Sequence, residues 1–334
     1  MKVAFDCSLP FMLAHGGAQI QIEQTMRALG EAGVEVEPLR WWDGKQTADI
    51  LQYYGRMSPT ASHLAQEKGI KVVIFDLLTA QGSRSWLRHV FHRNMIRLMT
   101  RLLPRSFTFA FGWDTYRLAD ACLTSTALEA DLMKYLFCVR PDRVHVVPNG
   151  VEDVFLSSRP VERGKWLVCT ATITERKRVV ELAEGAVKAQ TPLWVIGKAY
   201  SDTDPYAKRF YDVARQHPAI VRYEGPIPDR ARLAAAYREA RGFVLLSAME
   251  TLSLSAGEAV ACECPLLLSD LPWARTSFGE NAWYCPIGSV GKTAEVLRKF
   301  YDAAPGLKPP PRPMGWLDVA QQLKNIYSSL LAPR

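Results

Sequence analysis

The sequence predicts an α/β protein built from two doubly wound domains in tandem. Strand-like and helix-like segments alternate from the first residue to about Cys285, which is typical of parallel sheets wrapped by helices. A polar segment at residues 157–165 interrupts the alternation, which then restarts. The length of 334 residues is enough for two domains that each bury a core.

The first half contains both kinds of segment in regular succession. Apolar runs predict strands at residues 3–8, 35–41, 72–77, 121–124 and 145–147, and amphipathic patterns predict helices at 17–32, 85–103 and 126–137. The string Val147-Pro148-Asn149-Gly150 ends the last strand, because proline cannot donate to a ladder and Asn-Gly accepts a positive φ. We therefore expect a first domain over residues 1–157.

The second half repeats the pattern after the polar segment. Strands are predicted at residues 166–170, 193–196, 220–223, 243–246 and 266–269, which gives a second domain over 165–312. A proline-rich stretch at 308–313 precedes an amphipathic helix at 316–331. Ligands of doubly wound sheets bind outside the carboxyl ends of the strands, so two facing domains would enclose a cleft lined by strand-end loops.

Composition narrows the class of protein. A net charge of +7 suits an anionic ligand, an anionic membrane surface or nucleic acid. Nucleic acid is the poorest of these, because no recognised binding module accompanies the charge. The seven cysteines, without a C-x-x-C pair, indicate reduced thiols of a cytoplasmic protein. The chain shows neither a signal-peptide core at its start nor an apolar run long enough to span a bilayer.

Two glutamates near the carboxyl end form the most informative motif. Glu250 follows the strand at 243–246, and Glu258 lies in the helix predicted after Ser253. Between them, the backbone N–H groups of Leu254 and Ser255 are unpaired donors at a helix start, where a phosphate is favoured. Two carboxylates around an anion site suit a sugar joined to a diphosphate. The alternative is that Glu250 caps the helix and Glu258 is merely solvated.

Two further strand-end loops carry candidate ligand contacts. Arg176, Lys177 and Arg178 follow the strand at 166–170, directly before an apolar helix. Cations there oppose the helix dipole, so we favour a role in neutralising a diphosphate over a solvated helix start. Gly16 and Gly17 follow the first strand and would let the backbone approach a ligand. A plain tight turn explains these glycines equally well, because the dinucleotide fingerprint G-x-G-x-x-G is absent.

Several motifs occur together in an order that resembles retaining glycosyltransferases of family four. They are Val147-Pro148-Asn149-Gly150-Val151, the Arg176-Lys177 pair, the Gly225-Pro226 loop, Glu250 through Glu258, and Cys262-Glu263-Cys264-Pro265. The resemblance covers nearly the whole chain and implies the GT-B fold, in which two Rossmann-like doubly wound domains face a cleft. The closing segment from Gly315 to Tyr327 is similar to that family's end, so the helix at 316–331 is expected to return to the first domain.

The resemblance also implies a role for individual residues. Glu258 would bind the ribose hydroxyls of a nucleotide, Glu250 the hydroxyls of the transferred sugar, and Lys177 the diphosphate. Further donor contacts are implied for the amides of Leu254 and Ser255, for the backbone at Pro226 and Ile227 near the base, and for Gly16 and Gly17 at the diphosphate.

The chain departs from the family pattern at three places. Ala171-Thr172 stands where Gly-Arg is usual, so Thr172 takes the place of a cation at the donor site and Arg176 is the candidate replacement. Thr251 and Ser253 replace glycines that are common after the first glutamate. Asp76 directly follows the apolar residues 72–75 of the next predicted strand, where a histidine near the sugar is usual, and whether it replaces that histidine is open.

The resemblance implies a retaining hexosyltransferase, an enzyme of class EC 2.4, that uses a nucleotide diphosphate sugar. No side chain is an evident nucleophile, so we expect same-face substitution in which Lys177 and Arg176 stabilise the leaving diphosphate. No cofactor or metal is expected: Asp202-Thr203-Asp204 fits a D-x-D metal pattern, but its polar context favours a turn. A sugar-nucleotide epimerase and a non-catalytic binding subunit of the same fold remain alternatives.

A basic segment at residues 84–105 bears on the acceptor. It contains six arginines, two histidines and no acid. On a helix, Leu87, Phe91, Met95, Leu98 and Leu102 share one face, and Arg93, Arg97 and Arg101 lie opposite. Such a helix would suit peripheral attachment to the inner face of an anionic membrane and a glycan or lipid-linked acceptor in surface polysaccharide synthesis. Equally, an ordinary helix would pack this apolar face on the sheet.

Overall fold

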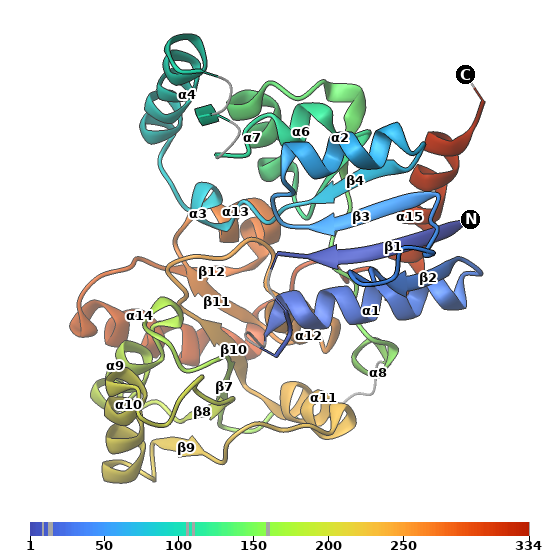
Figure 1. Ribbon diagram of the computed structural model, residues 1–334. Coiled ribbons are helices and arrows are strands. Elements are labelled where there is room, and N and C mark those ends of the chain that lie inside the picture. Colours follow the sequence, from blue (N-terminus) through green and yellow to red (C-terminus); the bar gives the residue numbers. More distant parts are fainter. Residues whose placement is uncertain (9, 13–15, 105–106, 109–110, 158–160, 334) are drawn as a thin grey trace. The chain divides into compact units, whose positions relative to one another are not determined.

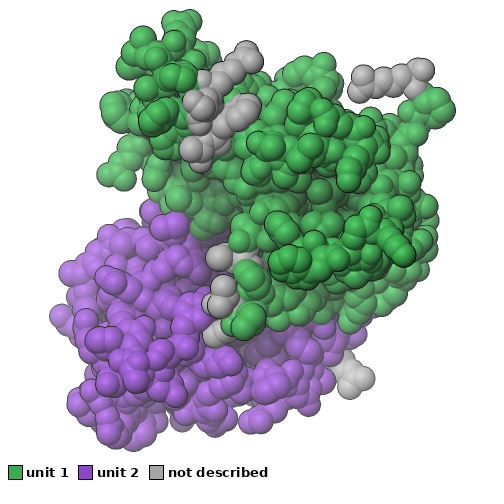
Figure 2. All heavy atoms as spheres, viewed as in Figure 1, with its two compact units in different colours: residues 1–150, 316–334 green, residues 151–315 purple. Residues whose placement is uncertain are grey.

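The protein, seen here in a computed structural model, consists of two compact units (Figures 1 and 2). The structure describes residues 1–8, 10–12, 16–104, 107–108, 111–157 and 161–333. Unit 1 comprises Met1–Gly150 and Trp316–Arg334, and unit 2 comprises Val151–Gly315. Each unit is a parallel sheet of six strands with helices around it, so the predicted α/β class and tandem doubly wound architecture are confirmed.

The sheet of unit 1 has the strand order β2-β1-β3-β4-β5-β6 with every neighbouring pair parallel. This is a flavodoxin-like order, in which the direction of winding reverses between β1 and β3. The strands are β1 (Lys2–Cys7), β2 (Glu35–Pro38), β3 (Ile50–Tyr54), β4 (Lys71–Phe75), β5 (Ala121–Thr124) and β6 (Val144–Val146).

The helices of unit 1 include one from the carboxyl end of the chain. Helix α15 packs against α1 (Figure 1), and its Tyr327 hydroxyl donates to the buried Gln52 side chain on β3. The last helix therefore completes the first sheet's cover, as expected. The helical elements are α1 (Gly17–Glu31), α2 (Pro59–Glu67), α3 (Thr79–Gly82), α4 (Trp86–Leu102), α6 (Thr115–Leu118), α7 (Ala127–Phe137), η1 (Pro141–Arg143) and α15 (Trp316–Leu331).

The sheet of unit 2 has the order β12-β11-β10-β7-β8-β9, again parallel throughout. This is the Rossmann order, and its direction of winding reverses between β7 and β10. The loops that follow these two strands therefore flank the position where such sheets bind ligands. The strands are β7 (Leu167–Thr170), β8 (Leu193–Ile196), β9 (Val221–Tyr223), β10 (Gly242–Leu245), β11 (Leu266–Ser269) and β12 (Trp283–Cys285).

The helices of unit 2 cover a core formed by the fully buried strands β8, β10 and β11 and their neighbours. They are α8 (Asp153–Leu156), η2 (Glu175–Lys177), α9 (Val179–Ala189), α10 (Pro205–Gln216), α11 (Arg230–Glu239), α12 (Leu254–Ala261), α13 (Pro272–Phe278), η3 (Gly279–Asn281), α14 (Val290–Ala303) and η4 (Ala304–Gly306). Helices α9 and α14 pack against each other, as do α11 and α12.

The elements that the sequence analysis missed include β3, β12 and α2. Strand β3 lies between β1 and β4, so it is interior to the sheet despite the polar Gln52 in its middle. That side chain is fully buried, and its amide donates to the Tyr54 hydroxyl over 2.9 Å while its carbonyl accepts from Tyr327. A glutamine whose hydrogen bonds are satisfied is tolerated in a core, but it breaks the apolar run that predicts a strand.

The chain passes between the units at different residues from those expected. The structural division falls at Gly150–Val151, whereas the sequence analysis ended the first domain at residue 157 and began the second at 165. Helix α8 belongs to unit 2 because Phe155 is fully buried in that core, with its ring 6.0 Å from the ring of Tyr237. At the crossing itself, a Cβ on Gly150 would lie 2.7 Å from the Cα of Trp316, so only glycine fits.

Glu129 of α7 is a buried acid that ties together two loops of unit 1. Its carboxylate accepts from the backbone N–H of Leu78 over 2.8 Å and from that of Ser125 over 3.0 Å. Those loops follow β4 and β5. Burial raises the pKa of Glu129 from 4.5 to about 7, against the lowering effect of these backbone hydrogen bonds. Between those two pH values the folded state binds a proton that the unfolded state has lost.

The stability of unit 1 should therefore fall as the pH rises from about 5 to about 8, with up to about 3 kcal/mol lost from this one group. The glutamine of a Glu129→Gln variant cannot ionise. The unfolding free energy of this variant should therefore rise relative to that of the wild type as the pH increases across the same range. Urea unfolding of both proteins at the two pH values measures this difference. A difference that stays constant with pH would show that the Glu129 carboxyl does not carry the dependence.

Candidate active site

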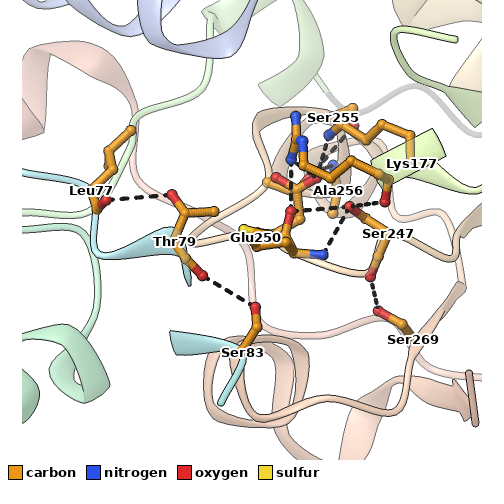
Figure 3. Close-up of polar contacts among 12 residues, drawn as sticks. Leu77, Thr79, Ser83, Lys177, Ser247, Glu250, Ser255, Ala256 and Ser269 are labelled. Atoms are coloured by element: carbon orange, nitrogen blue, oxygen red, sulfur yellow. Dashed lines mark hydrogen bonds and ion pairs between the residues drawn. The ribbon is translucent and has the colours of Figure 1, made fainter. Parts of the chain in front are cut away.

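The loops after β7 and β10 are joined where the winding of the unit 2 sheet reverses. The backbone N–H of Ala248 donates to the carbonyl oxygen of Arg176 over 2.8 Å, and the Ser247 hydroxyl donates to the same oxygen over 3.3 Å. Ser247 is in turn fixed by Ser269 at the end of β11, whose hydroxyl donates to the Ser247 carbonyl oxygen over 2.7 Å. Residues that follow or end three neighbouring strands thus hold these loops in one place, and Figure 3 shows the contact between Ser247 and Ser269.

Two cations from the first loop converge on a carboxylate from the second. The Lys177 ammonium donates to Glu250 Oε1, and Arg176 Nη1 lies 3.2 Å from the same oxygen (Figure 3 shows the lysine contact). Arg176 also donates to the Met249 carbonyl oxygen over 2.6 Å. The sequence interpretation in which Glu250 caps helix α12 is wrong, because the cap is the Ser253 hydroxyl, which accepts from the Ala256 N–H over 3.3 Å.

The electrostatic balance of this group favours an added anion. Two positive charges face one negative charge, which leaves a net charge of +1 on Arg176, Lys177 and Glu250 together. Glu250 is 9% exposed, so its interactions are only weakly screened by water. Helix α12 begins four residues later, and among the described residues the backbone N–H groups of Leu254 and Ser255 have no protein acceptor. Cations and free amides together are what phosphate groups bind.

Glu258 lies in a second polar group between α11 and α12. Arg230 Nη2 contacts Glu258 Oε1 over 2.5 Å and Glu152 Oε1 over 2.6 Å, and the buried Tyr237 hydroxyl lies 3.0 Å from Glu258 Oε2. The interpretation of Glu258 as a solvated residue is therefore wrong. Burial raises the pKa of Glu258, while Arg230 and the Tyr237 hydroxyl act in the opposite direction.

Arg230 is the site residue that the sequence analysis missed. It is the first residue of α11, directly after Asp229, whose side chain caps that helix. A cation at a helix start opposes the dipole, and this same signal singled out Arg176 to Arg178. The guanidinium also lies 4.7 Å from the centre of the Phe155 ring, so α8, α11 and α12 meet around it.

The remaining unit 2 candidates lie in neighbouring strand-end loops. Thr172 is half-buried after β7, and Pro226 is exposed after β9 while Ile227 is buried. The loops after β8 and β9 are linked by a hydrogen bond from the Gly197 N–H to the Gly225 carbonyl oxygen over 3.2 Å. In the described structure, Thr172 has no hydrogen bond with either charged group, so its assignment to the donor site stays a prediction, as do those of Pro226 and Ile227.

The first-domain candidates belong to the carboxyl edge of the unit 1 sheet. Gly16 has φ 145° and precedes Gly17, which begins α1, so the predicted helix start is confirmed. The predicted contact of both glycines with a diphosphate stays a prediction. Asp76 follows β4 and accepts a hydrogen bond from the buried Tyr116 hydroxyl, which in turn accepts from Arg56 Nε over 2.8 Å. Asp76 is thus oriented at the end of its strand.

The D-x-D pattern forms a helix cap. The side chain of Asp204 accepts from the Tyr206 N–H over 2.9 Å at the start of α10, which is the turn that the sequence favoured. Among the described residues, no three His, Cys, Asp or Glu side chains cluster as metal ligands do.

Helix α4 does not pack its apolar face on the sheet. Leu87, Phe91, Leu98 and Leu102 are between 58% and 79% exposed, and the fully buried positions are His89 and Ile96 on the opposite side. The alternative of an ordinary core-packed amphipathic helix is therefore wrong for this stripe, although Met95 is partly buried. Arg105, the last residue of the predicted segment, lies outside the described residues. Within the part of the chain that the structure describes, no helix is long and apolar enough to cross a membrane.

A comparison with known protein families finds a match within unit 2. Residues 164–303 match the family model of glycosyl transferases group 1. The matched range contains Arg176, Lys177, Arg230, Glu250 and Glu258. A curated relative, the D-inositol 3-phosphate glycosyltransferase of Xylanimonas cellulosilytica, is 27% identical over 249 residues. That match covers 63% of this chain and 57% of the relative, so it spans little more than half of the relative's length.

Solved structures share the fold over the whole chain. The crystal structure of Anabaena HepE in complex with UDP superposes with a TM-score of 0.63 at 14% identity, over 98% of this chain and 100% of that one. Sucrose-phosphate synthase from Thermosynechococcus elongatus superposes with a TM-score of 0.67 at 15% identity, over 99% of both chains. At these identities the likeness establishes the fold, which is the two-domain α/β GT-B architecture.

Removing the Arg230 guanidinium should destabilise unit 2. In an Arg230→Met variant, the buried Glu258 and the neighbouring Glu152 would face each other without a cation, which we expect to cost about 2 kcal/mol after allowing for the partial exposure of Arg230. A second change, Glu258→Gln, should recover much of this loss. Urea unfolding of the single and double variants measures both effects. Arg232→Met, on an exposed side chain of the same helix, is the control. Equal stability of the two single arginine variants would contradict the assigned role.

Proposed function

We propose that this protein is a glycosyltransferase that moves a sugar from a nucleotide diphosphate sugar to a hydroxyl acceptor. The observation that carries the proposal is the convergence of Arg176 and Lys177 on Glu250 where the unit 2 sheet reverses its winding. The match of residues 164–303 to glycosyl transferases group 1 supports it, because all three residues lie in that range.

The two charged groups would bind different parts of the sugar nucleotide. Lys177 and Arg176 would share their N–H groups between Glu250 and the incoming diphosphate, since Arg176, Lys177 and Glu250 together carry a net charge of +1. The Glu250 carboxylate would accept hydrogen bonds from the sugar hydroxyls. Glu258 would accept from the ribose hydroxyls, because a carboxylate has about four acceptor sites and Arg230 and Tyr237 use only part of them.

The remaining contacts with the sugar nucleotide would come from loops at the ends of strands. The N–H groups of Leu254 and Ser255 would bind phosphate oxygens at the start of α12, and the loop at Pro226 and Ile227 would meet the base. Gly16 and Gly17 would bring backbone amides of unit 1 to the diphosphate. Anabaena HepE is a UDP complex of the same fold, so uridine diphosphate sugars are the first donors to test.

Retention of the anomeric configuration is part of the proposal. The acceptor hydroxyl would attack from the face that the diphosphate leaves. The bond between the anomeric carbon and the phosphate oxygen breaks, a bond to the acceptor oxygen forms, and the acceptor's proton passes to the departing phosphate oxygen. Lys177 and Arg176 would stabilise the negative charge that grows on that oxygen, which is the electrostatic role expected of fixed cations. No resident metal or cofactor is required for this step.

Turnover should depend on the Lys177 and Glu250 side chains. With a uridine diphosphate sugar and a glycan acceptor, we expect free nucleoside diphosphate to appear only when acceptor is present, and the product to keep the donor's anomeric configuration. Lys177→Ala and Glu250→Ala should each lower the rate by about 100-fold or more, because each removes a charged contact to the reacting group. Proton NMR of the anomeric signals follows the rate and the stereochemistry in one experiment.

The matched controls are Lys188→Ala and Glu280→Ala, which remove the same charges at exposed positions of unit 2. An inverted product would contradict the same-face mechanism, and interconversion of the donor without acceptor would indicate an epimerase. If Lys177→Ala and Glu250→Ala left the protein's biological role intact, the non-catalytic binding subunit would be the better reading.

We also propose that α4 lies on an anionic membrane that presents a lipid-linked glycan acceptor. The exposed stripe of Leu87, Phe91, Leu98 and Leu102 has Arg88 on one flank and Arg97 and Arg101 on the other, so these last two arginines border the stripe rather than lie opposite it as predicted. In the described structure, the arginines of α4 form no ion pair. An apolar face bordered by unpaired cations is what an interfacial helix needs to bind acidic headgroups.

Reversing the exposed cations of α4 should abolish membrane binding. Arg88, Arg97 and Arg101 are suitable because Arg93 packs 4.2 Å over the Tyr135 ring and its loss would disturb the fold. We expect the Arg88→Glu/Arg97→Glu/Arg101→Glu variant to remain in the supernatant when the wild type co-sediments with vesicles of phosphatidylglycerol and phosphatidylcholine. A control with Arg209, Arg215 and Arg232 changed to Glu carries the same charge change on unit 2. Equal sedimentation of the two variants would contradict the assignment to α4.

A further inference from the structure

Two adjacent tryptophans of unit 1 are displayed to solvent directly after β2. Trp41 is 75% exposed and Trp42 is 100% exposed. Tryptophan is largely buried in most folded proteins, and removing its surface from water is strongly favourable. Two neighbouring indoles that remain in water are therefore more informative than scattered exposed apolar residues. They lie at the carboxyl edge of the sheet, where ligands of α/β folds bind.

The loop that carries these tryptophans is tightly ordered. Arg40 Nε donates to Asp43 over 2.9 Å, and its Nη1 donates to Glu37 over 2.5 Å. The Gln46 amide donates to Glu37 over 2.8 Å, and the Arg40 N–H donates to the Gln46 side chain over 2.7 Å. The side chains of Glu37, Arg40, Asp43 and Gln46 thus hold together the turn that carries the two tryptophans. A rigid support lowers the entropy that a ligand contact must overcome.

Trp41 lies near the neighbouring strand. Burial raises the pKa of Asp6, near the end of β1, while the Cys7 N–H and the Trp41 side chain lower it. Trp41 is thus both exposed and close to β1, one strand away from the point where the unit 1 sheet reverses its winding.

Most charges around the tryptophans are paired with one another, unlike those on α4, and among the described residues of this turn the exposed Lys45 is the exception. Lys2 Nζ lies 3.3 Å from Glu35 and 3.0 Å from Glu37, and Arg40 bridges Glu37 and Asp43. Such a surface has no excess of cations to attract an anionic bilayer or a phosphorylated ligand. Its features are flat aromatic faces and a rim of hydrogen-bonding groups. These fit a neutral ligand that is apolar on one face and rich in hydroxyls at its edge.

We propose that Trp41 and Trp42 form a stacking platform for a pyranose ring of a neutral glycan acceptor. The C–H bonds on the face of a pyranose carry partial positive charge, which the negative faces of indoles attract, and the ring's hydroxyls remain free for the polar rim. The identity of the ligand as the acceptor rests on the proposed glycosyltransferase function. The ability to bind a neutral sugar does not, so the two can be tested apart.

Fluorine NMR of the 5-fluorotryptophan-labelled protein tests the platform without relying on activity. The nine tryptophans give separate signals, and Trp41→Phe and Trp42→Phe variants assign two of them. On titration with neutral gluco-, galacto- and manno-oligosaccharides, we expect the Trp41 and Trp42 signals to shift. The signal of Trp86, an exposed tryptophan on α4, should not move. Shifts caused by anionic vesicles but not by oligosaccharides would overturn the proposal in favour of a membrane contact, and no shift with either would also overturn it.

Kinetics of the unlabelled variants then test the link to the acceptor. Trp42→Ala should raise the KM for a glycan acceptor about tenfold and leave kcat and the KM for the donor unchanged, because a fully exposed side chain has no role in the fold. Trp42→Phe should restore much of the affinity, and Trp86→Ala should match the wild type. Equal KM values for Trp42→Ala and the wild type would overturn the acceptor assignment. Sugar-dependent NMR shifts without any transfer would leave the platform standing and contradict the transferase function instead.

Discussion

The charged contact between Arg176, Lys177 and Glu250 depends on the strand order of the unit 2 sheet. Because the winding reverses between β7 and β10, the loops after these strands diverge to opposite faces and leave room at the sheet edge between them. The Ala248 and Ser247 contacts with the Arg176 carbonyl oxygen then fix the distance between the loops. A carboxylate that is almost fully buried needs a cation, and here it has two, so the group retains a positive charge for an anionic ligand.

A second polar group serves a different purpose from the first. Glu258, Arg230 and Tyr237 lie between α11 and α12, and Glu152 joins them from the start of unit 2. This group has one cation for two carboxylates and so carries a net charge of −1, which means that it positions a carboxylate rather than attracting an anion. The same contrast recurs on unit 1. Within the described residues, the arginines of α4 form no ion pair and lie beside exposed leucines, whereas most ions around Trp41 and Trp42 are paired with one another. These differences in charge separate a proposed membrane surface from a proposed sugar surface.

Local patterns predicted the fold class, the strands β5, β8 and β11 and the helix α15 to the residue, because each is an uninterrupted apolar run or an amphipathic stripe. Strand β3 was not predicted because Gln52 interrupts its apolar run, and the carbonyl of that buried glutamine accepts from Tyr327, which is far away in the sequence. The same kind of long-range pairing explains why Arg230 was missed although Glu258 was found. For α4, periodicity identified the apolar stripe but could not say which way it faces, since a buried stripe and a membrane-facing stripe have the same spacing.

We propose above all that Lys177 recognises the diphosphate and Glu258 the nucleoside. Calorimetric titration with UDP and with uridine tests it most directly, in the wild type, in Lys177→Met and in Glu258→Gln. We expect UDP to bind the wild type at least about 100-fold more tightly than uridine, Lys177→Met to remove most of that advantage while leaving uridine unaffected, and Glu258→Gln to weaken both ligands alike. A Lys177→Met variant that binds UDP as tightly as the wild type would contradict the account.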